Sequence, residues 1–253
     1  MARALLNVLR MDVSLYSAAS AMNATERWQD LIADNLSTAN IPGARQREAI
    51  FSAFPAGHSA TGEPFVIPFA SSAINFQQGE LRATGNNMDF AVEGPGFIQI
   101  QLPDGSKGYT RDGELKLNSQ GQLITKQGYT VMSEGGALQF DPNNAAPIRV
   151  SPEGEVSQGS EIKGKISVME FAKPGQLTLL GNGIFRNDVP TMLPQLAQNT
   201  KVHQGFIETA NTSPTLAMAS MITAMRMFES NEKVMSMQND RMGKAITELS
   251  GTS

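Results

Sequence analysis

Apolar residues seven positions apart run along the last part of the chain. A second apolar row stands three positions before members of the first. The rows are Met221, Phe228, Met235, Met242 and Leu249, and, three positions earlier, Met218, Met225 and Ile246. This a/d spacing is typical of a helix that packs a seam against another helix. At about 1.5 Å per residue, the helix is on the order of 50 Å long. Because such a helix is too long for the middle of a small domain, we expect it to have a partner helix.

The segment 12–40 carries a weaker stripe of the same kind, with steps of three and four residues. Its members are Leu15, Ala18, Met22, Thr25, Gln29, Ile32 and Leu36. Since Pro42 cannot continue a helix and Gly43 releases the chain, we expect this helix to end near them. The C-terminal helix is expected to begin at Pro214, with Ser213 as its N-cap. The sequence therefore predicts one long helix at each end.

The middle of the chain has a different pattern. From 63 to 188, short runs of alternating apolar and polar residues are separated by turn sequences such as Pro103-Asp104-Gly105 and Asp112-Gly113. Such runs predict β-hairpins. We therefore predict an α+β fold, in which long N- and C-terminal helices pair as a coiled-coil-like domain and an all-β, hairpin-rich module is inserted between them. The predicted divisions are 1–45 and 212–253 for the two halves of the helical domain, 46–80 for an extended linker or arm, 81–188 for the β-rich outer domain, and 189–211 for a second linker.

The C-terminal seam is rich in methionine, which is common in ordinary cores and also suits surfaces that repack against different neighbours. Two polar residues, Glu232 and Asn239, interrupt its second row. A polar residue in a seam specifies register at some cost in stability. We interpret the seam as a packing surface between subunits. The residues expected to pack between subunits are Leu15, Met22, Ile32, Leu36, Met218, Met221, Met225, Phe228, Met235, Met242, Ile246 and Leu249.

Composition excludes several functions. The net charge is −4, so we expect no nucleic-acid partner. The chain has no Cys and two His, which excludes thiolate sites and leaves little room for His-based metal sites. No run of about 18 apolar residues is present, so we expect no stable membrane insertion. Polar residues such as Asn7 and Arg10 interrupt the apolar start of the chain, and we expect no cleaved signal peptide.

Residues capable of catalysis are few. Asp104, Asp112 and Glu114 lie near predicted turns, where Asp hydrogen-bonds the following backbone. Lys107 and Arg111 are expected to form exposed cross-strand pairs. His203 has no partner residues at catalytic spacing, and Gly94-Pro95-Gly96 is expected to form a tight turn. We therefore predict no catalytic, cofactor-binding or metal-binding residues, and no enzyme activity.

Three segments carry a specific resemblance. Residues 32–43 read IADNLSTANIPG, residues 92–97 and 102–113 read VEGPGF and LPDGSKGYTRDG, and residues 204–211 read QGFIETAN. In this order they resemble the signature segments of the bacterial flagellar rod and hook proteins. The residues that carry the resemblance are Asn35, Leu36, Pro42, Gly43, Gly94, Gly96, Phe97, Asp104, Gly105, Tyr109, Thr110, Arg111, Gly113, Gly205, Glu208 and Asn211. The chain departs from the pattern at Asp34, where Asn is common, at Ala44, where an aromatic residue is usual, and at Ala210, where Ser is common.

The resemblance implies a structural subunit of the flagellar rod, the axial drive shaft that crosses the periplasm and transmits torque from motor to hook. It implies that the terminal helices form an inner coiled-coil domain with the β module outside. It also implies export by the flagellar type III apparatus and assembly with copies of the chain and other rod or hook subunits, without a cofactor. The compact segment after the first helix favours a proximal over a distal rod protein, and the length disfavours a hook protein.

Two alternatives compete with this interpretation. The chain would be an adaptor if its amphipathic terminal helices bound a membrane surface or a partner. It would be a cell-wall enzyme if carboxylates such as Asp104 and Glu114 cooperated in a cleft. The first alternative needs lipid or partner binding, and the second needs a catalytic pair of carboxylates.

Overall fold

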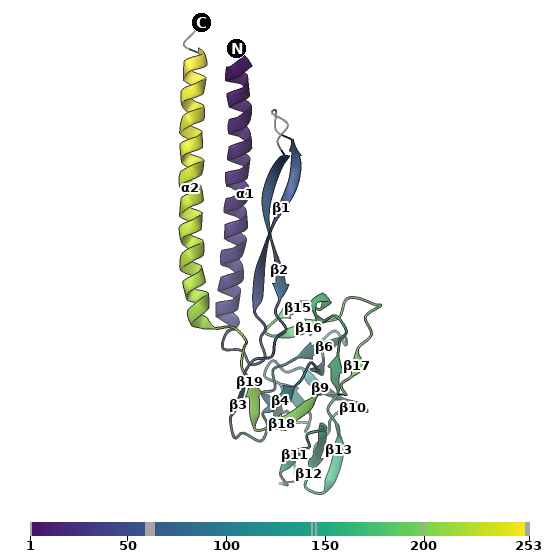
Figure 1. Ribbon diagram of the computed structural model, residues 1–253. Coiled ribbons are helices and arrows are strands. Elements are labelled where there is room, and N and C mark those ends of the chain that lie inside the picture. Colours follow the sequence, from purple (N-terminus) through teal and green to yellow (C-terminus); the bar gives the residue numbers. More distant parts are fainter. Residues whose placement is uncertain (1, 59–63, 143, 145, 199, 251–253) are drawn as a thin grey trace. The chain divides into compact units, whose positions relative to one another are not determined.

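The computed structural model describes residues 2–58, 64–142, 144, 146–198 and 200–250. Long helices α1 (Ala2–Thr38) and α2 (Pro214–Ser250) occupy the two ends of the chain, and all the described strands lie between them in the sequence (Figure 1). The chain divides into two units. The first is built from the described parts of 1–36, 47–73 and 214–253, and the second from 37–46 and the described parts of 74–213.

The first unit contains α1, α2 and the hairpin of β1 (Arg47–His58) and β2 (Pro64–Ile74). The strands of the second unit are β3 (Leu81–Ala83), β4 (Phe90–Glu93), β5 (Phe97–Gln101), β6 (Lys107–Thr110), β7 (Leu115–Leu117), β8 (Leu123–Thr125), β9 (Thr130–Ser133), β10 (Gly136–Ala137), β11 (Ile148–Val150), β12 (Glu155–Gln158), β13 (Glu161–Lys165), β14 (Val168–Glu170), β15 (Thr178–Gly181), β16 (Ile184–Arg186), β17 (Gln195–Leu196), β18 (Lys201–Gln204) and β19 (Phe206–Glu208), with a 3₁₀ turn at Pro174–Gln176. The helices contact each other, and the β region lies between them in the sequence, which confirms the predicted α+β fold.

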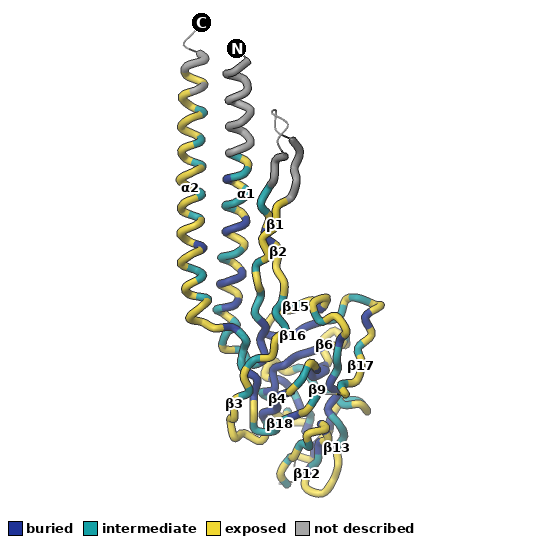
Figure 2. The backbone as a smooth tube through the Cα atoms, in the orientation of Figure 1, coloured by how far each residue is buried: buried dark blue, intermediate teal, exposed yellow. Residues whose placement is uncertain are grey.

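Helix α1 lies between α2 and the hairpin and is the more buried of the two helices (Figures 1 and 2). Buried and half-buried residues recur along it at the spacing predicted from the sequence, and Leu15, Met22, Ile32 and Leu36 are among them. Thr25 marks the side that faces α2, because its hydroxyl lies 3.4 Å from the Asn231 amide nitrogen. Leu31, which is also buried, lies on the side next to the hairpin. In the described residues, neither helix has a stretch apolar enough to cross a membrane.

The inner face of α2 differs from the predicted seam in one of its two rows. Its more buried positions are Ala217, Met221, Ala224, Phe228, Asn231, Met235, Gln238 and Met242. The row that contains Met221 is therefore as predicted. The second row stands four positions before the first and not three, and its Ala224 is fully buried. Small Ala residues let two helices approach closely, whereas Met218 and Met225 point to solvent. Consequently the polar interruptions of this seam are Asn231 and Gln238, and the predicted Glu232 and Asn239 are exposed.

The segment predicted as an extended linker or arm over 46–80 consists mostly of paired strands, which form the β1–β2 hairpin, so the linker interpretation is wrong. Two contacts attach it to α1. The Asn35 side chain donates to the Arg47 carbonyl and accepts from the Arg47 amide, both at 2.7 Å, as a neighbouring strand would. Trp28 packs edge-to-face on Phe51 with ring centroids 5.7 Å apart. The prolines that suggested a linker are tolerated here because a two-stranded sheet has two open edges.

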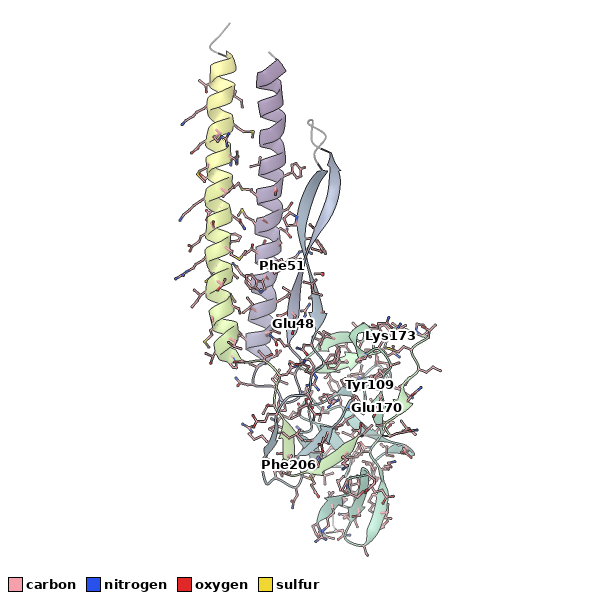
Figure 3. The ribbon with its side chains drawn as sticks, viewed as in Figure 1. Glu48, Phe51, Tyr109, Glu170, Lys173 and Phe206 are labelled. Carbon is pink, nitrogen blue, oxygen red and sulfur yellow. The ribbon has the colours of Figure 1, made fainter. Side chains whose placement is uncertain are left out.

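The second unit is organised around a large sheet with the strand order β15-β16-β6-β5-β9-β8-β7, to which β10, β14 and β17 add. Strand β5 separates two apolar clusters, because Ile98 and Ile100 point to one face and Phe97 to the other. The first cluster is Phe90, Val92, Ile98, Ile100, Leu102, Leu115, Leu123, Val131, Leu138, Phe140, Val156, Ile166, Val168, Ile184 and Val202. The second is Phe97, Tyr109, Phe171, Leu177, Phe185 and Met192, and Figure 3 labels Tyr109 among the strands.

The prediction of a linker over 189–211 is also wrong. Strand β18 pairs with β4, and β19 pairs with β3, both antiparallel. Val202 and Ile207 are 4% and 2% exposed, so this segment belongs to the packed core of the second unit. The segment has two prolines and many polar residues, and the pairing partners of β18 and β19 lie more than a hundred positions away in sequence. Local patterning therefore carries little information about it.

Gly113 shows how tightly the second unit packs. Its carbonyl accepts from the Phe90 amide at 2.9 Å. A Cβ added to Gly113 would lie 1.5 Å from the Phe90 carbonyl oxygen, a backbone atom that cannot move without breaking strand β4.

We expect Gly113→Ala to destabilise the second unit by at least about 3 kcal/mol, the upper end of the usual overpacking range. Thermal unfolding of the full chain, followed by calorimetry, measures this effect. The matched control is Gly175→Ala, because no atom lies within 4 Å of the added Cβ and the backbone there has no positive φ. Equal melting temperatures for the two variants would contradict the predicted clash.

Candidate functional site

The outward face of α2 exposes a large amount of apolar surface in the described structure. Its most exposed large apolar residues are Leu216, Met218, Ile222, Met225, Met227, Val234, Met237 and Ile246, which are 38–69% accessible. Large exposed apolar side chains in such number are typical of an interaction site. Three predicted packing residues, Met218, Met225 and Ile246, are exposed, whereas Met221, Phe228, Met235 and Met242 belong to the inner face. The side chain of Leu249 lies outside the described residues.

A buried carboxylate organises the second unit. Glu208, at the end of β19, is 0% exposed and accepts an ion-paired hydrogen bond from the guanidinium of Arg45 at 2.5 Å. Its second oxygen accepts from Arg111 at 3.1 Å. The amide of Gly79 donates to the same oxygen as Arg45, at 2.8 Å. Glu208 therefore joins three segments that are far apart in the sequence.

Arg111 is held on several sides. Its guanidinium donates to the carbonyls of Val92 at 3.2 Å and Gly94 at 2.5 Å, and it lies 4.8 Å from the ring centroid of Phe97. Burial lowers the pKa of Arg111 to about 10, while the neighbouring Glu208 acts in the opposite direction. Arg111 therefore remains charged at neutral pH. The prediction of an exposed cross-strand Arg111 is wrong, because this side chain is 3% accessible.

The charges in this cluster do not balance. Two guanidinium groups surround one carboxylate, and three of their nitrogens, Nε and Nη2 of Arg45 and Nε of Arg111, are buried without a hydrogen-bond partner among the described residues. Partial loss of hydrogen bonding makes a buried charge costly. Glu208 is consequently the group on which the burial of both arginines depends.

Backbone contacts complete the cluster. The Gly43 amide donates to the Glu208 carbonyl at 2.8 Å. Gly43 has a φ of +67°, and an added Cβ would lie 2.4 Å from the Arg111 backbone, so only glycine fits. The Asn211 side chain accepts from the Gln46 amide at 2.6 Å and donates to the carbonyls of Asn75 and Gln77, both at 2.9 Å. These hydrogen bonds therefore hold the segment that follows α1 against the segment that precedes α2.

All three signature segments meet in this cluster, through Gly43, Arg111 and Glu208 with Asn211. Of the other signature residues, Phe97 and Tyr109 lie in the second apolar cluster, and Gly205 has a φ of +80° at the β18–β19 turn. Sequence reasoning did not single out Arg45 or Gly79. The available signal for Arg45 was a charged residue two positions after the end of a signature segment.

The carboxylates considered for cell-wall chemistry have separate structural roles. Asp104 accepts from the amide and hydroxyl of Ser106, at 2.9 and 2.6 Å, and these hydrogen bonds lower its pKa. A lowered pKa is the opposite of what a general acid needs. Glu114 instead forms an ion pair with Lys126. No group of three or more potential metal ligands occurs in the described part of the chain.

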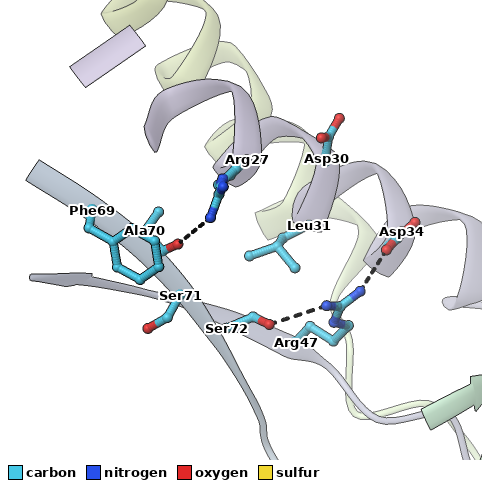
Figure 4. Close-up of a pocket in the computed structure, with 9 residues that line it drawn as sticks. All are labelled: Arg27, Asp30, Leu31, Asp34, Arg47, Phe69, Ala70, Ser71 and Ser72. Carbon is cyan, nitrogen blue, oxygen red and sulfur yellow. Dashed lines mark hydrogen bonds and ion pairs between the residues drawn. The ribbon is translucent and has the colours of Figure 1, made fainter. Parts of the chain in front are cut away.

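The first unit contains a cleft of about 310 Å³ between α1 and the hairpin (Figure 4). The Arg47 guanidinium crosses it, pairing with Asp34 at 2.9 Å and donating to the Ser72 hydroxyl at 3.2 Å. Arg27 donates to the Ala70 carbonyl and lies over the Phe69 ring. The arrangement ties the hairpin to the helix. It gives a structural role to Asp34, one of the departures from the signature pattern.

We expect Glu208→Gln to destabilise the second unit by about 3–5 kcal/mol, because two buried guanidinium groups lose their counter-charge. Hydrogen exchange at the amides of β4, β6 and β19, together with the melting temperature, measures the loss. The control is Glu161→Gln, which makes the same change in an exposed ion pair with Lys163. If both variants exchange at the same rate as the unmodified chain, Glu208 does not hold this unit together.

Asp112 gives a pH-dependent prediction. It is 3% exposed, and its carboxylate accepts from the Glu114 amide at 3.0 Å. Burial raises its pKa to about 6, and the nearby Glu114 charge contributes in the same direction. Because the folded state binds a proton that the unfolded state has released, stability falls as the pH rises from about 4 to about 6.

We therefore expect Asp112→Asn, which keeps the accepting oxygen, to stabilise the chain by about 1–3 kcal/mol above pH 6 or so. The gain should shrink as the pH falls toward about 4, where the native carboxyl is also neutral in the folded state. Denaturant unfolding of both proteins across this pH range tests the sign. A gain that is constant with pH would show that removal of the charge is not its cause.

Comparisons with known proteins identify the family. The family model for the flagellar hook protein FlgE/F/G D1 domain matches residues 91–158, and the model for the flagellar basal body rod FlgEFG protein C-terminal region matches residues 203–248. These matches include two of the three signature segments. They begin in the middle of β4 and β18, respectively, so each covers strands that surround the buried cluster.

Relatives match nearly the whole chain. Flagellar basal-body rod protein FlgF of Mesorhizobium japonicum is 34% identical, over 96% of this chain and 100% of the relative. FlgF of Caulobacter vibrioides is 32% identical over 94% and 98%, and the rod protein FlgG of Borreliella burgdorferi is 30% identical over 92% and 97%. The family consists of structural, non-catalytic proteins, so the prediction that the chain is not an enzyme is confirmed. The chain belongs to the FlgF/FlgG family of flagellar basal-body rod proteins.

Proposed function

We propose that this rod protein is the proximal type, FlgF, and that it assembles through the exposed face of α2. Two FlgF relatives, at 34% and 32% identity, and the compact hairpin that follows α1 support the proximal assignment. The partners are other copies of the chain and further rod or hook subunits. In this role the subunit forms part of the shaft that carries torque from the motor to the hook, after export by the flagellar type III apparatus.

The observation that carries the proposal is the unequal use of the two faces of α2. The inner face, with Ala224 fully buried, is occupied by α1. Away from this inner face, large apolar side chains of α2 have no covering element among the described residues of the first unit, and Met218 and Met225 are 54% and 52% exposed. A surface helix that serves only an internal pair typically keeps such residues on its covered face. These exposed apolar side chains therefore support helix packing between subunits.

The residue types on this face suit a polymer. Met218, Met225, Met227 and Met237 have unbranched, polarisable side chains that adapt to irregular neighbours. Because the proposed partners include copies of the chain and other rod or hook subunits, this surface would meet neighbours of different sequence. Burial of the exposed apolar residues contributes about 25 cal/mol per Å² of covered area, which supplies the driving force for assembly.

We expect Met225→Lys to abolish rod assembly and motility in a bacterium that lacks its own copy of this protein. The isolated chain should keep its circular dichroism, because residue 225 touches solvent in the free subunit. The matched control is Ser230→Lys, which adds the same charge at an exposed polar position of the same helix. Isolated basal bodies, counted by electron microscopy, report assembly.

Normal rods with the Met225→Lys variant would show that this face is not used between subunits. Sedimentation with lipid vesicles addresses the adaptor alternative, since vesicle binding that is lost in Met225→Lys would indicate a membrane-binding face instead.

A further inference from the structure

The large sheet of the second unit leaves part of one face uncovered. On the face that carries Phe97, the second apolar cluster covers the sheet around Tyr109 and Phe185. Next to this cluster lies an open cavity of about 320 Å³. It is lined by Gln99, Lys107, Met132, Ser133, Glu134, Gly136, Ser167, Met169 and Leu196. The cavity lies within the second unit, apart from the helix face used in the proposed function.

Strand register places the main cavity residues on one face of the sheet. Gln99 is opposite Tyr109, and Gln101 is opposite Lys107, so Gln99 and Lys107 are diagonal neighbours. Met169 is opposite Phe97 and also opposite Leu196. Because side chains alternate along a strand, all of these residues point away from the first cluster. The cavity is therefore a continuation of the surface on which the second cluster packs.

Three residues of the lining, Met132, Met169 and Leu196, are apolar. Met132 and Met169 are half-buried, and Leu196 is 51% exposed. Leu193, close to Leu196 in the chain, is 74% exposed. Two flexible thioether side chains beside leucine form a surface that adapts to an aliphatic group.

Two other residues of the lining, Gln99 and Lys107, provide hydrogen-bond donors. Gln99 is 4% exposed, and its carbonyl oxygen accepts from the Ser167 hydroxyl at 3.2 Å. Its amide nitrogen has no hydrogen-bond partner among the described residues and is not fully enclosed. Lys107 is exposed and forms no ion pair with the residues that the structure describes. Glu134, the carboxylate of the lining, is paired with Lys165 at 3.2 Å.

We propose that this cavity binds a loop of a partner protein that presents an aliphatic side chain next to an aspartate or glutamate. The aliphatic group packs on Met132, Met169 and Leu196. The carboxylate accepts from the Gln99 amide nitrogen and lies close to the ammonium of Lys107. Charge complementarity selects this partner, because the unpaired donors of the site are one amide and one cation while its own carboxylate is already neutralised.

Titration of the full chain with the capped dipeptide acetyl-Asp-Leu-amide tests the proposal. Nuclear magnetic resonance of the Gln99 side-chain amide and the Met169 methyl group provides the readout. We expect saturable shifts of both signals at millimolar peptide. Binding should be at least about fivefold weaker for acetyl-Asn-Leu-amide, which loses the charge-assisted hydrogen bond. Acetyl-Lys-Leu-amide should be weaker still.

Variants separate the site from general charge effects. Lys107→Met should remove the preference for the Asp peptide over the Asn peptide, and it changes an exposed side chain that folding does not need. The matched control, Lys173→Met, removes an equally exposed charge that does not line the cavity (Figure 3). Gln99→Leu should reduce Asp-peptide binding. If that variant fails to fold, the Asp-over-Asn preference of Lys107→Met is sufficient to test the proposal.

Three results would overturn the proposal. The first is the absence of shifts at Gln99 and Met169 up to about 20 mM Asp peptide, far above the millimolar range expected for a small fragment. The second is equal binding of the three peptides. The third is an unchanged Asp-over-Asn preference in Lys107→Met. None of these results bears on the outer face of α2, so the proposed assembly role is tested separately.

Discussion

The burial of Glu208 between two arginines is the constraint on which the second unit depends. A carboxylate with no accessible surface is tolerable only if its charge is compensated, and here Arg45 and Arg111 compensate it from different parts of the chain. The same carboxylate fixes the Gly79 amide, and its own backbone carbonyl fixes Gly43. A hydrophobic replacement of the whole cluster would fill the same space. It would not, however, specify which segments must meet.

This specificity matters because the cluster joins the segments next to the two helices. Arg45 lies shortly after α1, and Glu208 shortly before α2. Asn211 adds hydrogen bonds to the backbone on both sides. A subunit that carries load along a shaft needs its β region to be held at both of its chain connections. A network of directional hydrogen bonds supplies that hold better than apolar contacts, because it loses energy steeply when the geometry changes.

In each unit, part of an element's surface packs within the unit and part remains exposed. In the first unit, α1 is covered on two sides by α2 and the hairpin, whereas α2 is covered on one side only. In the second unit, one face of the large sheet is covered by the first cluster and the other is covered in part by the second. What remains open in each case includes apolar side chains, methionine among them. Such surfaces are costly in an isolated molecule and useful in an assembly.

Much of the architecture was predictable from local patterns. Helices at both ends, the start of α2 at Pro214, the row of Met221 and Phe228, and the hairpin around Gly105 follow from periodicity and turn residues that act over a few positions. The turn at Gly113 joins β6 to β7, which do not pair with each other. The signature segments indicated the family, and the comparisons confirmed it. Tertiary structure alone decided that 47–74 forms a hairpin on α1, that Ala224 and not Met225 faces α1, and that Arg111 is buried against Glu208. These outcomes depend on contacts between residues far apart in sequence, whose desolvation and pairing energies exceed local propensity and leave little trace in any one segment.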